Sequence, residues 1–348
     1  IRLSLVGSEM CIRDSINEME DAGSLEGILN VVVLWDRFSQ PDAIYYIQYH
    51  DSNYSNWSDI VSPRVNSGGA VLPITFKSQE EIIEDFLIWA MQEYPADHYS
   101  FTVSSSGGFP YMLTDEPIWT LRDAVETVLV HPSCNVSKLD TIGLEVVGTS
   151  YLETAYCLRN VAHSVFAVET NSVGIDFWDF GGLRYTEPLE YLKDNGSVAT
   201  YQGLCSSMVL EFLDYTVFPP GKNLAASYTG NAEFYDAYNL LEDFAQALNI
   251  AFDTPEHRNA IEQARGDAGN WGYACSDFND KDLGLFAQLI ADDPVFPTSL
   301  RDIAQDLADA IEIAMIEHGH TDDVFGTGSI CPFEETGWQI WFPDKLCD

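Results

Sequence analysis

Short apolar runs that alternate with helical patterns constrain the fold of this chain more than any other feature. The run at residues 31–34 is β-branched and of strand length, and a helix with one apolar face follows further along the chain. Ser78 and Glu81 have the spacing of a capping box at the start of that helix, and Pro95 ends it. We expect strands at residues 31–34, 44–47, 99–103, 139–147 and 165–168, and further helices at 121–129 and 150–162.

Strands that are apolar almost throughout, and that alternate with helices, are typical of a parallel sheet covered by helices on both faces. After about residue 182 the helical patterns dominate. We therefore predict an α/β core over residues 16–182 and a helical subdomain over residues 183–348, whose C-terminal strand returns to the core. The helices are expected at residues 201–215, 234–252, 255–265, 283–290 and 300–318, and the last strand at 338–342.

The charge balance is extreme, because 55 Asp and Glu residues stand against 16 Lys and Arg residues among 348, a formal net charge of −39 at pH 7. Such a chain repels a polyanion, so we expect no nucleic-acid partner. A solvated acidic surface is the favoured explanation, and an affinity for Ca²⁺ or for basic peptides is the alternative. No apolar run approaches the roughly 20 residues of a membrane-spanning helix, so no membrane span is expected.

The first fifteen residues, IRLSLVGSEMCIRDS, resemble a translated adapter sequence. We predict that residues 1–15, and Cys11 with them, are not native; a short native strand over residues 1–6 is the alternative. No signal peptide is recognised in this segment. The other cysteines permit disulfides without requiring them, and Cys331 and Cys347 flank the last strand and could close a loop. Without C-x-x-C spacing, a structural zinc site is not expected for the remaining six, Cys134, Cys157, Cys205, Cys275, Cys331 and Cys347.

In parallel α/β sheets, functional sites lie beyond the carboxyl ends of the strands. Two such ends stand out here, at residues 104–108 and 145–148. The segments around them resemble, in order, those of the clostripain family of cysteine peptidases in the caspase-like clan. This resemblance covers residues 16–344 and implies a caspase-like fold, a mostly parallel sheet covered by helices on both faces with a helical C-terminal subdomain. The stretches that carry it are residues 17–24, 31–37, 44–47, 94–108, 138–156 and 336–344.

The family's mechanism implies a His–Cys dyad at these two strand ends, in which the histidine activates the thiol for attack on a peptide carbonyl. Ser106 stands at the position that matches the histidine, and Val147 at the position that matches the cysteine. Valine has no nucleophilic atom, and serine has no usefully basic lone pair near neutral pH. The resemblance therefore predicts that the dyad is lost and that the chain is not an active peptidase.

Two other residues have the chemistry to substitute for the dyad, but the sequence places neither at these strand ends. Cys157 follows Val147 by ten residues, inside the next helix, and His98 precedes Ser106 by eight residues, at the opposite end of its strand. The serines at 104–106 lack the G-x-S-x-G elbow of serine hydrolases. An active cysteine-type peptidase or other hydrolase with an unrecognised nucleophile stays open as an alternative, as does a structural or scaffold domain of a larger secreted protein.

Two acidic residues are candidates for binding a peptide. Glu145 keeps a carboxylate near the place where the family's acidic residue helps to bind a Lys or Arg side chain, and Asp176 could be a second such acid. The resemblance thus implies a residual pocket for Lys- or Arg-containing peptides, and a secreted or cell-envelope location. The alternative, two unremarkable acids in a chain full of them, has equal weight. A peptide or protein is the expected partner.

No cofactor is expected, and Ca²⁺ is the one ion to consider. Asp51, Asn53 and Ser55, and likewise the acids of residues 277–282, alternate as Ca²⁺ ligands do. Neither group has the glycine and the distal glutamate of an EF-hand loop, so a solvated surface is favoured. His318 and His320 follow a helix and are expected in an exposed turn.

One departure from the family bears on folding. The family begins with a core strand and a short acidic loop before the stretch that matches residues 17–24, and here residues 1–15 fill that place. We therefore expect that the first central strand is missing, which would leave a gap or an exposed strand edge.

Overall fold

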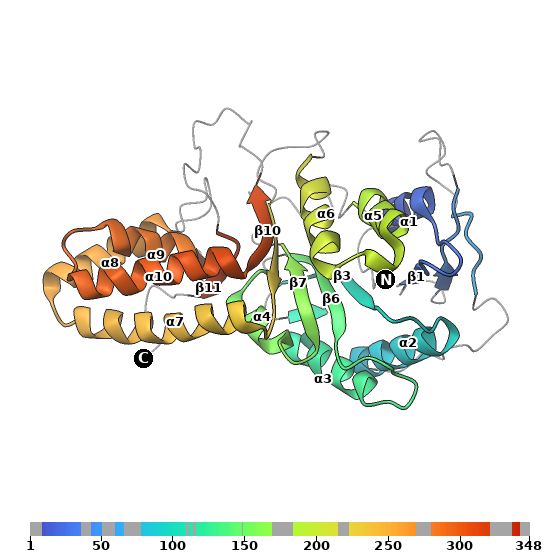
Figure 1. Cartoon of the computed structure of the whole chain (residues 1–348), viewed down its shortest axis with the longest axis horizontal. Helices are drawn as coiled ribbons and strands as arrows, with labels where there is room; N and C mark the ends of the chain where they lie inside the picture. The colour runs from blue at the N-terminus through green and yellow to red at the C-terminus, as the bar shows by residue number, and fades with distance from the viewer. Residues whose placement is uncertain are drawn as a thin grey trace.

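A computed structural model shows a seven-stranded sheet with helices on both faces and a group of helices extending from one edge (Figure 1). This architecture confirms the predicted α/β class. The residues that the structure describes are 9–35, 43–50, 60–65, 78–108, 111–113, 116–147, 149–168, 184–214, 223–268, 280–320 and 336–341.

The centre of the sheet is parallel. β3 (Ser100–Gly108) pairs in parallel with β6 (Leu139–Val147), which pairs in parallel with β7 (Ala162–Ala167). The outer strands run antiparallel to their inner neighbours, and the full order is β10-β8-β7-β6-β3-β4-β5. These outer strands are β4 (Tyr111–Leu113), β5 (Glu116–Pro117), β8 (Asn223–Tyr228) and β10 (Met315–His320).

Each face of the sheet is covered by its own layer of helices (Figure 1). One layer contains α2 (Gln79–Glu93), α3 (Ile118–Leu129) and α4 (Leu152–Leu158). The other contains α1 (Glu9–Ala22), α5 (Thr186–Asn195) and α6 (Tyr201–Asp214). The capping box predicted for α2 is confirmed, because the Glu81 amide donates to Ser78 Oγ at 3.2 Å and the Ser78 amide donates to the Glu81 carboxylate at 2.9 Å.

The second half of the chain supplies helices and also two strands of the central sheet, β8 and β10. Its last strand, β11 (Gln339–Trp341), pairs with β9 (Asp280–Asp282) in a sheet of two strands. The boundary predicted near residue 182 lies outside the described residues. The helices are α7 (Ala232–Ala251), α8 (Pro255–Asp267), α9 (Leu283–Asp292) and α10 (Thr298–Ala314), with a short 3₁₀ helix, η3 (Gly196–Val198), after α5. Among the described residues, no helix combines the length and the apolarity that crossing a membrane requires.

Two expectations about the second half are wrong. The helix predicted over residues 300–318 ends at Ala314, and the chain continues as β10. His318 and the backbone of His320 therefore lie in a strand and not in a turn, since β10 pairs with β8 from Met315 to His320. β8 itself was not predicted, because its sequence, NLAASY, is rich in small residues and has little strand propensity.

The first two strands of the described residues form a sheet of their own. Within the described ranges, β1 (Val32–Trp35) pairs with β2 (Ala43–Tyr46) alone, as a separate antiparallel sheet. Both faces of β1 are nevertheless buried, as in a strand from the middle of a covered sheet. Residues 1–8 lie outside the described part of the chain, and α1 runs across the limit predicted for the non-native segment at residue 15.

Candidate functional site

The two positions predicted to match the family's dyad lie at the carboxyl ends of adjacent parallel strands. Ser104 on β3 pairs with Glu145 on β6, and Gly108 pairs with Val147. Ser106 lies between the two β3 positions, and Val147 ends β6. The fold therefore brings the two predicted positions to one edge of the sheet, although their side chains lie outside the described part of the structure.

The end of β3 is irregular at this point. Between the pairs Ser104–Glu145 and Gly108–Val147, β3 advances four residues while β6 advances two. Extra residues of this kind form a bulge, which bends a strand and changes the direction of its side chains, and bulges are frequent next to active sites. Ser104 Oγ is buried and has no hydrogen-bond partner among the described residues. Ser106 thus belongs to an irregular strand end and not to a regular ladder.

A buried polar cluster lies beneath this edge. Glu145 has no exposed surface, and its Oε2 accepts a hydrogen bond of 3.1 Å from the hydroxyl of Tyr185, just before α5. Arg184, the preceding residue, forms an ion pair with Glu18 of α1. The proposed peptide-binding acid Glu145 is therefore held inside the protein by a residue that is distant in sequence.

The surroundings of Glu18 change the pKa of its carboxyl group. Burial raises the pKa of Glu18 to about 8, and the carboxylates of Glu145 and Asp14 act in the same direction, while Arg184 lowers it. Burial and the neighbouring Glu145 also raise the pKa of Tyr185 well above its ordinary value. At neutral pH Glu18 thus retains its proton, because burial disfavours its charged form more than Arg184 favours it.

Sequence analysis did not identify Glu18, Arg184 or Tyr185. The one local signal is Arg184 itself, a cation among only 16 Lys and Arg residues. Nothing near it in the sequence indicates its partner, because the ion pair joins residues 166 positions apart.

The turn that leaves β6 is fixed by two hydroxyl side chains. Thr149 Oγ1 donates to the Val146 carbonyl at 2.7 Å, and Ser150 Oγ donates to the Gly337 carbonyl at 2.6 Å. The next helix, expected from residue 150, begins at Leu152. The helix cap is Tyr151, which makes no side-chain capping bond, and α4 ends at Leu158 instead of continuing to 162.

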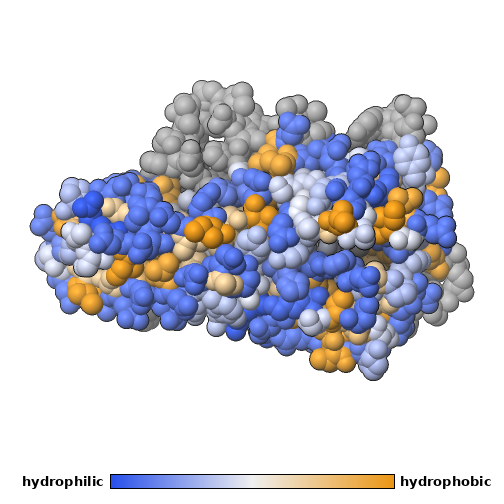
Figure 2. Space-filling model, viewed as in Figure 1, coloured by the Kyte–Doolittle hydropathy of each residue, from blue (hydrophilic) through white to orange (hydrophobic). Residues whose placement is uncertain are grey.

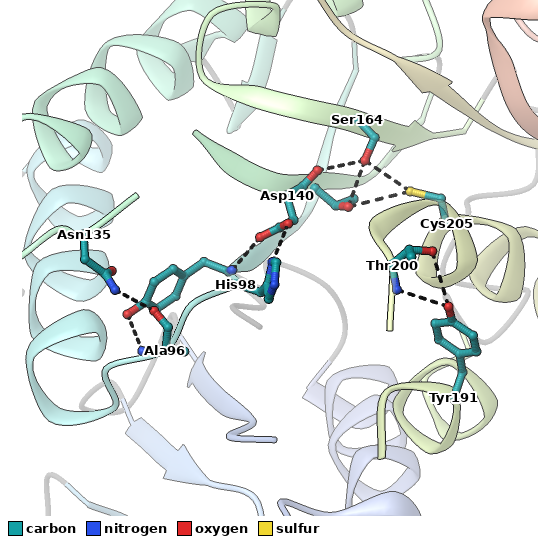
Figure 3. A network of polar contacts seen from close by, with 10 residues as sticks. Ala96, His98, Asn135, Asp140, Ser164, Tyr191, Thr200 and Cys205 are labelled. Atoms are coloured by element: carbon teal, nitrogen blue, oxygen red, sulfur yellow. Dashed lines mark hydrogen bonds and ion pairs between the residues drawn. The ribbon is translucent and has the colours of Figure 1, made fainter. Parts of the chain in front are cut away.

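Neither residue considered as a substitute for the dyad reaches this edge. His98 precedes β3, and its Nδ1 lies 2.9 Å from Asp140 Oδ1 at the opposite end of the sheet (Figure 3). Cys157 is in the last turn of α4, where burial raises the pKa of its thiol. A raised pKa disfavours the thiolate, which is the nucleophilic form of cysteine. Cys134, Cys157 and Cys205 are free thiols.

The remaining predicted sites fall largely outside the described residues. Asp176 and residues 51–55 are among them, as are residues 277–279. Asp282 is described, and its carboxylate is buried: it accepts hydrogen bonds from the Leu285 amide at 2.7 Å and from Thr336 Oγ1 at 2.6 Å. Asp282 therefore caps α9 and holds the chain before β11. In the described ranges, no cluster of three or more His, Cys, Asp or Glu residues is arranged to hold a metal ion.

Solved structures share this fold over most of their length, whereas neither models of known protein families nor curated protein sequences match the chain. A secreted C11 cysteine protease from Bacteroides thetaiotaomicron, "iotapain", is 14% identical, with a TM-score of 0.63 over 92% of this chain and 85% of its own. An inactive zymogen of a C11 protease from Parabacteroides distasonis is 13% identical, with a TM-score of 0.62 over 98% of this chain and 90% of its own. The chain therefore has the fold of the C11 cysteine proteases.

Proposed function

We propose that this chain is a catalytically inactive homologue of the C11, or clostripain, cysteine peptidases, which binds Lys- or Arg-containing peptides at the carboxyl ends of β3 and β6. One observation carries the proposal: Ser106 and Val147 stand at neighbouring ends of parallel strands, where the family resemblance implies the His–Cys dyad. A location outside the cell goes with it, supported by the secreted B. thetaiotaomicron protease of the same fold.

The loss of catalysis follows from the chemistry of the two side chains. Attack on a peptide carbonyl needs a nucleophile and a base that increases its reactivity. Valine at 147 offers neither role, and serine at 106 is not a base near pH 7. Neither Cys157 nor Cys205 replaces the missing cysteine, because burial raises the pKa of Cys157 and raises that of Cys205 to about 11.

A cleavage assay tests the inactivity. An Arg- or Lys-ester peptide is supplied, with Ca²⁺ and a reductant, to the wild type and to the double variant Ser106→His/Val147→Cys. The wild type is expected to show no turnover and the double variant to cleave, while each single variant stays inactive because each role depends on the other. Cleavage by the wild type that persists in Ser106→Ala/Val147→Ala would place the catalytic residues elsewhere and refute the proposal.

Peptide binding rests on the acids of the site. The Tyr185 hydroxyl contacts the Glu145 carboxylate where a Lys or Arg side chain would have to bind, so the peptide competes with Tyr185 for this acid. Asp176 supplies a second carboxylate in the proposal. A Lys or Arg side chain that displaced the Tyr185 hydroxyl would form a charge-assisted hydrogen bond with the carboxylate, and such a bond selects basic side chains.

Titration calorimetry with a Lys-containing peptide and its norleucine analogue tests the binding. The double variant Glu145→Ala/Asp176→Ala is expected to bind the Lys peptide at least ten-fold more weakly, whereas Tyr185→Phe binds it more tightly because the competing hydroxyl is gone. Equal affinity for both peptides, or no effect of the double variant, would remove the binding part of the proposal and leave the inactivity intact. The same titration with Ca²⁺ tests whether the acidic chain binds this ion.

A further inference from the structure

The two oxygens of the buried Glu18 carboxyl group have different surroundings. Oε1 accepts a hydrogen bond from the guanidinium of Arg184, whereas Oε2 is buried and has no hydrogen-bond partner among the described residues. The Glu18 side chain is 6% exposed, so solvent scarcely reaches it. A buried oxygen without a donor disfavours the charged carboxylate much more than the neutral carboxyl group. The contacts of Glu18 therefore favour its protonated form.

Glu145 lies close enough to Glu18 for their charges to interact. The connection runs through two consecutive residues, because Arg184 holds Glu18 while the Tyr185 hydroxyl donates to Glu145 Oε2 at 3.1 Å. Burial is the largest cause of the raised pKa of Glu18, and the negative charge of Glu145 acts in the same direction. A cation that neutralises Glu145 therefore lowers the pKa of Glu18.

The other charged side chains around this pair are acids from three helices. Burial raises the pKa of Asp14 on α1 and of Glu211 on α6, while Arg184 acts in the opposite direction on both. Glu187 on α5 is exposed, and its charge also raises the pKa of Glu211. Hydrophilic residues cover most of the face shown in Figure 2, and acids outnumber bases by 55 to 16 in the whole chain. The protein as a whole therefore attracts a basic peptide.

The protonation of Glu18 decides the net charge that it forms together with Arg184 and Glu145. When Glu18 is neutral, the Arg184 guanidinium balances the Glu145 carboxylate. When Glu18 is ionised, two buried carboxylates share one guanidinium, and burial disfavours the excess negative charge. A Lys or Arg side chain that displaces the Tyr185 hydroxyl from Glu145 supplies the missing positive charge. Tyr185 keeps its own proton, because burial and Glu145 hold its pKa well above the ordinary value.

We propose that a Lys or Arg side chain that binds the Glu145 carboxylate expels the proton of Glu18 to the solvent. This inference rests on the function proposed above and adds the regulation of that site. Linkage is reciprocal, so a rise in pH that removes the proton from Glu18 strengthens the binding of the basic peptide. The affinity increases with pH below pH 8 and levels off above it, where the free protein has already lost this proton.

Titration calorimetry on the full chain measures the release of the proton. The peptide acetyl-Ala-Ala-Lys-Ala-Ala-amide is titrated at pH 7 in phosphate and in Tris, whose heats of ionisation differ, so each proton passed to the buffer changes the measured enthalpy. We expect release of about 0.3 proton or more per bound peptide, and an affinity that rises about five-fold from pH 6 to pH 8.5. The norleucine analogue has no ammonium group and should release no proton. Binding of the Lys peptide with equal heats in both buffers and no pH dependence would overturn the inference and leave the proposed peptide binding intact.

Glu18→Gln supplies the matched variant, because its amide does not titrate but still offers an oxygen to Arg184. It should bind the Lys peptide equally at pH 6 and pH 8.5 and release no proton, while Glu26→Gln, at an exposed position, should follow the wild type. Proton release that persists in Glu18→Gln would assign the proton to another group and overturn the inference. The measurement on the wild type decides the question if Glu18→Gln fails to fold. Absence of binding at every pH would refute the proposed function and this inference with it.

Discussion

The two faces of β6 differ in chemistry although they share one backbone. Toward α2, α3 and α4, the side chains of Ile142, Leu144 and Val146 are fully buried in an apolar core. Toward α5 and α6, Thr141 and Glu145 are just as buried, and each makes a side-chain hydrogen bond. One face therefore holds the sheet by apolar burial, and the other fixes polar groups in position up to the carboxyl end of the strand.

Side-chain contacts connect the polar face to α6, the helix that covers it. Thr141 Oγ1 lies 2.9 Å from Ser164 Oγ, which in turn lies 3.4 Å from Cys205 Sγ on α6 (Figure 3). Gly143, between Thr141 and Glu145, has no room for a side chain, because a Cβ there would clash with the ring of Phe166. The polar face therefore tolerates little change in the shape of its side chains, even though their burial stabilises the protein less than burial of the apolar side chains on the other face.

The largest loss of stability is expected from a substitution on the apolar face. Leu144→Ala removes a fully buried side chain and leaves a cavity between the sheet and its helices. We expect the free energy of unfolding to fall by about 3 kcal/mol, within the usual range for such changes. Urea denaturation at constant pH measures it. A loss below about 1 kcal/mol would mean that this face does not carry the stability assigned to it.

The next effect concerns the charged cluster on the polar side, and it depends on pH. The pKa of Glu18 is about 8 when folded and 4.5 as a free side chain, so the folded protein binds the extra proton between these values. The stability that Glu18 contributes is complete below pH 4.5 and is lost as the pH rises through 8. Each pH unit in this window costs up to ~1.4 kcal/mol of the free energy of unfolding, and the pKa of about 8 already includes the attraction of Arg184.

Glu18→Gln isolates this contribution, because the amide does not titrate. Urea denaturation from pH 5 to pH 8 should show a smaller fall in stability for Glu18→Gln than for the wild type. Glu26→Gln, at an exposed position, serves as the control and should follow the wild type. If the pH dependence of Glu18→Gln is unchanged, the proton retained by the cluster is not on Glu18.

The smallest effect is expected for Thr141→Val, which keeps the shape of the side chain and removes its hydroxyl. Ser164 Oγ retains its contact with the Asp140 carbonyl at 2.9 Å, so no partner loses all its hydrogen bonds. We expect a loss of about 1 kcal/mol in the free energy of unfolding, as for one net hydrogen bond. A loss as large as that of Leu144→Ala would erase the difference between the two faces.

Local patterns in the sequence predicted those parts of the fold that local interactions determine. The capping box at Ser78 and the strand at residues 139–147 were placed correctly, since each depends on neighbouring residues. β10 was assigned to the preceding helix because the same kinds of residues continue without a break. Only its pairing with β8, about ninety residues earlier (Met315 with Ser227), decides that it is a strand.

The candidate site likewise has a part that the sequence predicts and a part that it does not. The strand ends that hold Ser106 and Val147 could be located from the sequence, because parallel strands place their carboxyl ends together. The burial of Glu145 and its contact with Tyr185 could not, because they depend on how α1 and α5 pack on the sheet. A carboxylate with the same sequence environment could equally have been exposed to a ligand.

Trp338 sets a constraint on how the chain reaches its folded state. Its fully buried indole packs edge-on against Phe234, and its Nε1 donates to Ser227 Oγ, 111 residues earlier, at 3.1 Å. A ribosome that adds about 5–20 residues per second needs roughly 5–20 s to pass from Ser227 to Trp338. During synthesis the apolar surface around Phe234 waits that long for its last partner, an interval in which a chaperone could bind it.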